Sequence, residues 1–159
     1  MKKRINVSQT QPKAYKAMYA LVDYLGGTKI TSNIKQLVKL RASQINGCAY
    51  CLEMHTEEAK KVGLSVDKLM LLNAWKESSY FTEDERAALA LTEEVTLIHQ
   101  GGVSDETYDR AISVFGEEYV AQLIMEIVTI NAWNRISIAT RAEFRQHAES
   151  NLVSAANSN

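Results

Sequence analysis

The 159-residue chain contains one proline and seven glycines, and no convincing run of alternating polar and apolar residues that would favour a β-strand. Because proline and glycine interrupt helices, their scarcity leaves long stretches open to helix formation. Alanine, leucine, glutamate and lysine, which favour helix, are frequent. The sequence therefore predicts an all-α fold.

Other absences exclude classes of function. The formal net charge is -1 and the pI is about 6.3, so no basic field is present to attract nucleic acid or an anionic membrane. No apolar stretch approaches the length of a membrane span, and no apolar segment of a signal peptide follows the basic start. No Gly-x-Gly-x-x-Gly pattern indicates a nicotinamide or flavin. We expect a cytoplasmic protein that uses no cofactor and binds neither nucleic acid nor membrane.

A chain of this length can bury a hydrophobic core without disulfides to stabilise it, which leaves its two cysteines free for chemistry. We expect a single domain over residues 1–147. Residues 148–159 are rich in serine, asparagine and alanine and have little to bury, so we expect a disordered tail there.

Hydrophobic spacing and capping residues predict about seven helices. They cover roughly residues 12–25, 32–46, 48–63, a segment after 65, 83–100, 104–116 and 117–146. The segment after 65 carries an apolar run, 69–72, that we expect to be buried on more than one side. The last helix places Asn131 and Asn134 on an apolar stripe, where buried amides need hydrogen-bond partners. We expect both to join neighbouring backbone or a subunit interface rather than to act in catalysis.

Both cysteines fall in one short segment, Cys48-Ala49-Tyr50-Cys51, and His55 follows one helical turn later. Two thiols separated by two residues can close a small disulfide ring, which is typical of a redox couple. On a helix, these three side chains share one face. A thiolate that attacks a peroxide becomes a sulfenic acid, which the second thiol converts to a disulfide. An external dithiol must then reduce the pair by exchange.

Each cysteine has its own route to a reactive thiolate. Cys48 lies at a predicted helix N-terminus, whose dipole favours the thiolate, whereas Cys51 is closer to His55, whose imidazole can take its proton. The residues leave open which sulfur attacks first. The spacing also fits a zinc site, but zinc prefers four ligands. The remaining nitrogen donors, His99 and His147, have no recognisable spacing to the motif, so we expect no metal.

The segment from Leu37 to His55 resembles the carboxymuconolactone decarboxylase family, in particular its AhpD-like alkylhydroperoxidase branch. Residues 81–90 and 130–135 add to the resemblance, which covers roughly residues 10–146. It implies an all-helical fold with repeated helical hairpins and assembly into trimers or hexamers. It also implies reduction of hydroperoxides by thiols, with a dithiol or protein reductant as partner.

The family's active pattern is a glutamate, eleven residues, Cys-x-x-Cys, three residues and a histidine. Cys48, Cys51 and His55 match three of its four positions, but this chain has Gln36 in place of the glutamate. Well-studied members also carry a histidine where this chain has Tyr50, a poor base at neutral pH. The resemblance implies a proton relay that starts at the glutamate, and a neutral amide cannot accept a proton.

Three accounts of Gln36 are open. A carboxylate from another helix, Glu85 or Glu94, replaces the glutamate in space, although ordinary solvent-facing charges are the simpler interpretation of both. Alternatively His55 works alone with Gln36 only orienting it, which gives a slower peroxidase. Or peroxide is not the main substrate.

We predict a thiol-dependent peroxidase that reduces alkyl or hydrogen peroxides through Cys48 and Cys51, assisted by His55. The alternative is a thiol–disulfide oxidoreductase or a redox-sensing oligomer with little peroxidase activity. The dithiol disfavours a true lactone decarboxylase, because the resemblance implies that this branch lacks it.

Overall fold

The structure is a computed structural model that describes residues 4–143. Eight α-helices, two short 3-10 helices and no strands occur in this part of the chain, which confirms the all-α class. The predicted tail at 148–159 and His147 lie outside the described residues. The helices are α1 (Val7–Thr10), α2 (Pro12–Gly26), α3 (Ser32–Asn46), α4 (Ala49–Lys61), α5 (Val66–Leu71), η1 (Leu72–Ala74), α6 (Glu83–Thr96), η2 (Ile98–Gln100), α7 (Asp105–Phe115) and α8 (Glu117–Thr140).

The first and last of the described helices differ from the prediction. The short helix α1 is additional; the Asn6 side chain caps it by accepting a hydrogen bond from the Gln9 backbone N–H at 3.2 Å. Helix α8 ends at Thr140 and not near 146, because Arg141 adopts a left-handed backbone with φ 55. The Arg141 N–H then bonds to the Ile138 carbonyl at 3.2 Å, which closes the helix without the glycine that usually marks such an end.

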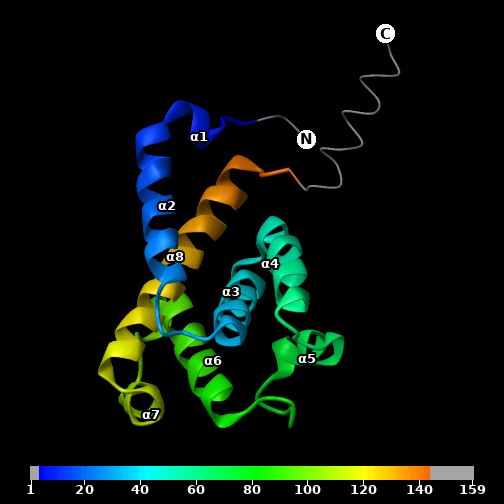
Figure 1. The fold of residues 1–159 in the computed structure, drawn as a ribbon, viewed down its shortest axis with the longest axis vertical. Helices are drawn as coiled ribbons and strands as arrows, with labels where there is room; N and C mark the ends of the chain where they lie inside the picture. The colour runs from blue at the N-terminus through cyan, green and yellow to red at the C-terminus, as the bar shows by residue number, and fades with distance from the viewer. Residues whose placement is uncertain (1–3, 144–159) are drawn as a thin grey trace.

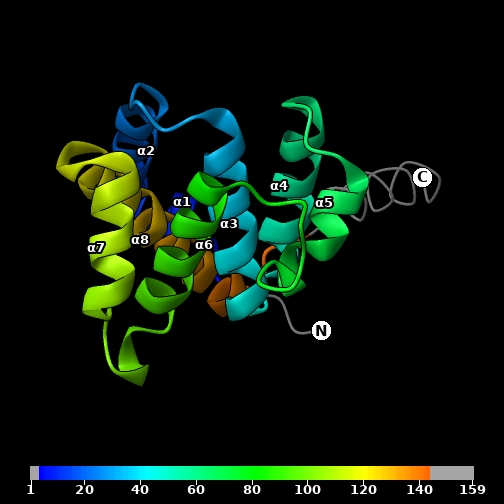
Figure 2. The ribbon, with the colours of Figure 1, turned by 90° about the horizontal axis from the view of Figure 1, so that it is seen from below.

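Helix α3 lies at the centre of the described fold, with α4 on one side and α6 and α8 on the other (Figure 2). Its two faces belong to two hydrophobic clusters. One cluster joins α3 to α6, α7 and α8 and contains Ile30, Ile34, Val38, Ala88, Leu91, Ala111, Val120, Leu123 and Ile127. The other joins α3 to α4, η1 and α6 and contains Leu37, Leu40, Ala59, Leu64, Leu72, Trp75, Phe81 and Leu89. Because both faces of α3 are buried, the position of this helix is well fixed. The turn that carries the two cysteines follows directly after its C-terminal end.

Helix α5 is more exposed than the sequence predicts. Leu72 is buried, but Met70 is 78% exposed and Leu71 is also exposed, so the expected burial of this run on more than one side is wrong. The α-helix has only six residues before it tightens into η1, and it packs one side against the second cluster.

Helix α2 runs beside α8 at the edge of the molecule (Figure 1). An aromatic group joins the two, since the Trp133 ring centroid lies 5.0 Å from that of Tyr15 and 5.4 Å from that of Tyr19. Only Leu25 of α2 is fully buried. Within residues 4–143 no helix combines the length and the apolar character needed to cross a membrane.

Candidate active site

The dithiol lies at the turn that joins α3 to α4. Gly47 ends α3 with a left-handed backbone at φ 68, a conformation that glycine adopts without the clash of a β-carbon. Cys48 follows as the N-cap of α4, and its sulfur accepts a hydrogen bond from the Cys51 N–H at 3.4 Å. A thiolate at Cys48 is therefore placed at the positive end of the helix dipole, as the sequence predicts.

Cys48 and Cys51 form a disulfide, with their Cα atoms 5.4 Å apart. Both residues are 1% exposed. The spacing thus brings the two sulfur atoms together in a disulfide, inside the protein rather than on its surface.

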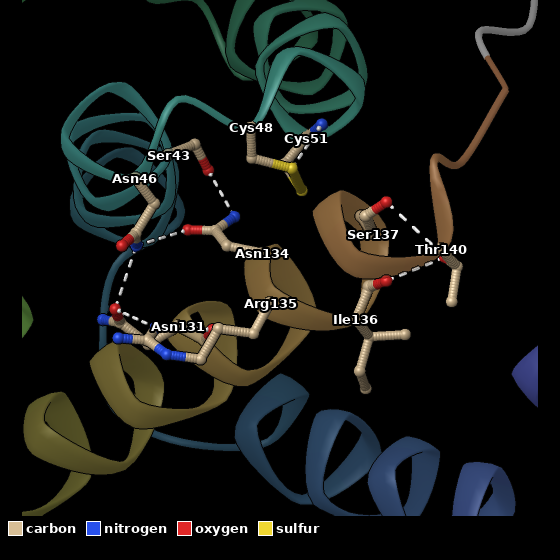
Figure 3. Close-up of a disulfide and its surroundings, with 10 residues drawn as sticks. All are labelled: Ser43, Asn46, Cys48, Cys51, Asn131, Asn134, Arg135, Ile136, Ser137 and Thr140. Atoms are coloured by element: carbon tan, nitrogen blue, oxygen red, sulfur yellow. Dashed lines mark hydrogen bonds between the residues drawn. A yellow bond between two sulfur atoms is a disulfide. The ribbon is translucent and has the colours of Figure 1, made fainter. Parts of the chain in front are cut away.

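A buried polar network holds this turn against α8 (Figure 3). The Asn46 amide, two residues before Cys48, donates to the side-chain oxygens of Asn131 and Asn134, both at 2.9 Å. The Asn134 amide in turn donates to the Ser43 hydroxyl at 3.0 Å, and Asn131 donates to Thr96. The two α8 amides are therefore hydrogen-bonded, as predicted, but their partners on other helices are side chains and not the backbone or subunit interface that the sequence led us to expect. They fix the end of α3 from which Cys48 starts.

His55 lies on α4 one turn after Cys51 and is only 5% exposed. Its Nδ1 is 3.0 Å from a carboxylate oxygen of Glu58, one further turn along the same helix. The hydrogen bond from His55 holds the pKa of Glu58 below its usual range, and the positive charge of Lys39 lowers it further. Glu58 is a site residue that the family pattern does not indicate, although its position three residues after His55 is a helical spacing that could have indicated it.

Gln36 is buried on α3, and its side-chain amide also lowers the pKa of Glu58. Its own carbonyl oxygen is buried without a partner. The residue at the family's glutamate position therefore lies beside the carboxylate that holds His55.

The suggested substitutes for the missing glutamate are elsewhere. Glu85 is buried and forms an ion pair with Lys68 at 2.6 Å, and it also completes the capping box of α6, so both the relay and the solvent-facing interpretation are wrong for it. Glu94 caps the start of α7, where it accepts hydrogen bonds from Ser104 and Thr107. Neither lines the cavity that holds the disulfide.

The disulfide opens into a cavity of about 1160 Å³. Cys48, Cys51, His55 and Glu58 all line it. Much of the remaining wall is apolar or aromatic and includes Tyr15, Tyr19, Met54, Ile130, Trp133 and Ile136. The cavity can therefore receive a small or medium-sized apolar molecule next to the sulfur atoms.

A second charged pair lines the same cavity. Glu126 of α8 is 2% exposed, with one oxygen 3.4 Å from the Lys39 ammonium and the other without a partner. The sequence shows Glu126 only as a charge within an apolar run, and that run gives no sign of its neighbour on α3. Among residues 4–143 no three potential protein ligands come together in a group that could hold a metal ion.

The sequence matches the model of the carboxymuconolactone decarboxylase family over residues 12–94. It is also 39% identical, over 139 residues, to the uncharacterised protein YdfG of Bacillus subtilis (strain 168), a match that covers 87% of this chain and 95% of YdfG. The chain belongs to the carboxymuconolactone decarboxylase family. Decarboxylases and AhpD-type peroxidases are both members of this family, so its members are enzymes.

Solved structures place this family member near the AhpD-like branch. ATU0492 of Agrobacterium tumefaciens, a protein of unknown function proposed to be the antioxidant defence protein AhpD, matches with a TM-score of 0.86 and 38% identity. The match covers 90% of this chain and 98% of that one, which confirms the expected AhpD-like fold. The debrominase Bmp8 matches with a TM-score of 0.77 at 22% identity, over 86% of this chain and 74% of that one, and shows a shared fold.

Proposed function

We propose that this protein is a thiol-dependent peroxidase that reduces alkyl or hydrogen peroxides through Cys48 and Cys51. The observation that carries the proposal is the buried disulfide that shares one cavity with His55. The likeness to a protein proposed to be AhpD supports the same assignment. The apolar wall of the cavity suits the organic part of an alkyl hydroperoxide.

In the reaction that we propose, His55 takes the proton of the Cys51 thiol, and the thiolate attacks the outer oxygen of the hydroperoxide. The S–O bond forms as the O–O bond breaks, and the alcohol leaves with the proton. The Cys48 thiol then attacks the sulfenic acid, which releases water and closes the disulfide. Two thiols are oxidised for each peroxide reduced, and no cofactor is required.

A dithiol must reduce the disulfide before the next cycle. Because both cysteines are 1% exposed, the burial favours a reductant that is small or that carries its thiols on a protruding segment. We place the enzyme in the cytoplasm, where dithiols stay reduced, and we expect it to form trimers or hexamers as the family resemblance implies.

The experiment adds one equivalent of an organic hydroperoxide to the fully reduced protein and follows peroxide and free thiols over seconds to minutes. The expected result is loss of one peroxide and two thiols per chain, which Cys51→Ser abolishes. Persistence of both thiols and peroxide would reject the peroxidase. The second candidate, disulfide exchange or redox sensing, would then take its place. Oligomer size with and without reductant tests sensing, because a sensor reassembles and a catalyst does not.

A further inference from the structure

The imidazole of His55 is held by a carboxylate that the family pattern does not include. Its Nδ1 is 3.0 Å from Glu58, whereas the position that the pattern assigns to a glutamate holds Gln36. We propose that Glu58 positions His55 in this site, in the role that the resemblance gives to a glutamate at position 36. This inference rests on the proposed peroxidase function, but its test measures thiol reactivity directly.

The hydrogen bond fixes which nitrogen of His55 can act as a base. An ionised carboxylate can only accept, so Nδ1 carries the hydrogen that points to Glu58. The other nitrogen, Nε2, is then free to take the proton of the Cys51 thiol. When it does so, the negative charge of Glu58 stabilises the imidazolium, as the acid does in nucleophile–histidine–acid arrangements.

Helix α4 and its N-cap carry the whole group. Cys48, Cys51, His55 and Glu58 follow one another at steps of three, four and three residues, which places them on one side of α4. All four line the same cavity. The distance between Glu58 and His55 therefore depends on the local geometry of α4 and not on how α3 packs against it.

Glu58 also connects the buried imidazole to solvent. Its side chain is 42% exposed, while that of His55 is 7% exposed. The hydrogen bond from His55 lowers the pKa of Glu58, so the carboxylate is ionised at neutral pH. It is thus placed between the base and the water with which that base must exchange protons.

The neutral side chain of Gln36 fits this arrangement. Its amide lowers the pKa of Glu58 and adds no charge. A glutamate at position 36 would place a second carboxylate beside the first, and one of two adjacent carboxylates takes up a proton because like charges repel. We infer that this site, like the family pattern, pairs one carboxylate with one imidazole. The carboxylate lies on α4 here, whereas the family pattern places it on α3.

Other charged groups around Glu58 balance its charge. Lys39 from α3 acts on it through its positive charge, and Lys39 also lies 3.4 Å from Glu126 of α8. On α4 itself, the neighbouring Glu57 is paired with Lys60 at 2.8 Å and is not among the residues that line the cavity. Glu57 is therefore a matched control for Glu58.

The test uses a Cys48→Ser background, which leaves one thiol and keeps a favourable N-cap at α4. The second-order rate of alkylation of Cys51 by iodoacetamide is measured between pH 5 and pH 10, a range set by the ordinary thiol pKa of about 8.5. We expect Glu58→Gln to lower the rate at pH 7 by about tenfold and to move the profile to higher pH, since a half-exposed charged hydrogen bond is lost. Glu57→Gln should leave the profile unchanged.

A carboxylate at position 36 provides the rescue. Gln36→Glu alone should give no gain in alkylation rate, because the two carboxylates share a proton. Combined with Glu58→Gln, it should recover about threefold or more of the lost rate, since the group around His55 again contains one carboxylate. A purely structural role of Glu58 predicts no such recovery. Far-UV circular dichroism and thermal unfolding of each variant exclude a folding defect as the cause.

The result that would overturn the inference is a Glu58→Gln profile that superimposes on that of the parent. If the variant that combines Gln36→Glu with Glu58→Gln reacts no faster than Glu58→Gln alone, the inference that a carboxylate at position 58 takes the role of one at position 36 is also overturned. Both of these results can be told apart from a failure of the proposed peroxidase function, because they are measured by alkylation and not by peroxide consumption. If the parent protein consumes no peroxide while Glu58→Gln still shifts alkylation, the peroxidase proposal is wrong and the role of Glu58 stands.

Discussion

Replacing Asn134 by alanine should loosen the turn that carries the dithiol. Asn134 is fully buried, at 0% exposure, and makes two hydrogen bonds to the end of α3. It donates to Ser43 at 3.0 Å and accepts from Asn46 at 2.9 Å. Because this site is buried, water cannot replace the two hydrogen bonds in the folded variant.

The expected cost follows from these contacts. Two net hydrogen bonds contribute about 1 kcal/mol each, and the Ser43 hydroxyl, also at 0% exposure, is left without the Asn134 donor at a further cost of about 1 kcal/mol. Asn46 keeps its bond to Asn131, so its amide adds little. Removal of the side chain also leaves a small cavity, which brings the loss in free energy of unfolding to about 3–4 kcal/mol.

Urea denaturation of the reduced protein, followed by circular dichroism at constant protein concentration, measures this difference. Asn33→Ala is the matched control, because Asn33 is exposed at the start of α3, and its change should stay within about 0.5 kcal/mol. A loss below about 1 kcal/mol in Asn134→Ala would refute the argument that this network anchors the turn.

Three further predictions follow from the same contacts. Reduced Cys48→Ser should consume one equivalent of hydroperoxide and stop as a sulfenic acid detectable by mass spectrometry, whereas Cys51→Ser should consume none; the reverse result would make Cys48 the attacking thiol. The pKa of Glu58 is lowered from 4.5 by its bond with His55, so the pair stabilises the fold above about pH 4.5 and loses this contribution as the pH falls through the lowered value. Denaturation midpoints of Glu58→Gln should lack that acid-side fall, and an unchanged pH dependence would contradict the pairing. Glu93 accepts from Trp75 at 2.7 Å and pairs with Arg41 and Lys76, each at 2.9 Å, so Glu93→Gln should lower the free energy of unfolding in urea by about 2 kcal/mol, and a neutral result would mean that the cluster adds no net stability.

Local signals in the sequence predict most of the helices. Pro12 begins α2, Gly47 ends α3, and the residues from Thr82 to Glu85 form the capping box of α6. These signals act within one turn of the backbone, so they are visible without the fold. Local signals did not predict the end of α8, because Arg141 takes a left-handed backbone that few residues other than glycine adopt.

Sequence spacing likewise predicts some features of the candidate site and misses its contacts between helices. The spacing of Cys48, Cys51 and His55 predicts one reactive helix face, and the structure places all three on one cavity. The spacing could not show that Glu85 pairs with Lys68, because those residues belong to different elements and meet only when α5 packs near α6. Charges distant in sequence carry no periodic signal of their partners.

What the sequence alone determined is therefore the all-helical class and the pairing of two cysteines at a helix start, since these depend on residue type and short-range spacing. Tertiary structure decided how the site is completed. It buried the disulfide, brought Asn46 against two amides of α8, and placed Gln36 of α3 beside Glu58 of α4. The physical reason is that hydrogen bonds and ion pairs between helices depend on packing of apolar surfaces, and those surfaces specify which helices meet only after the whole chain has collapsed.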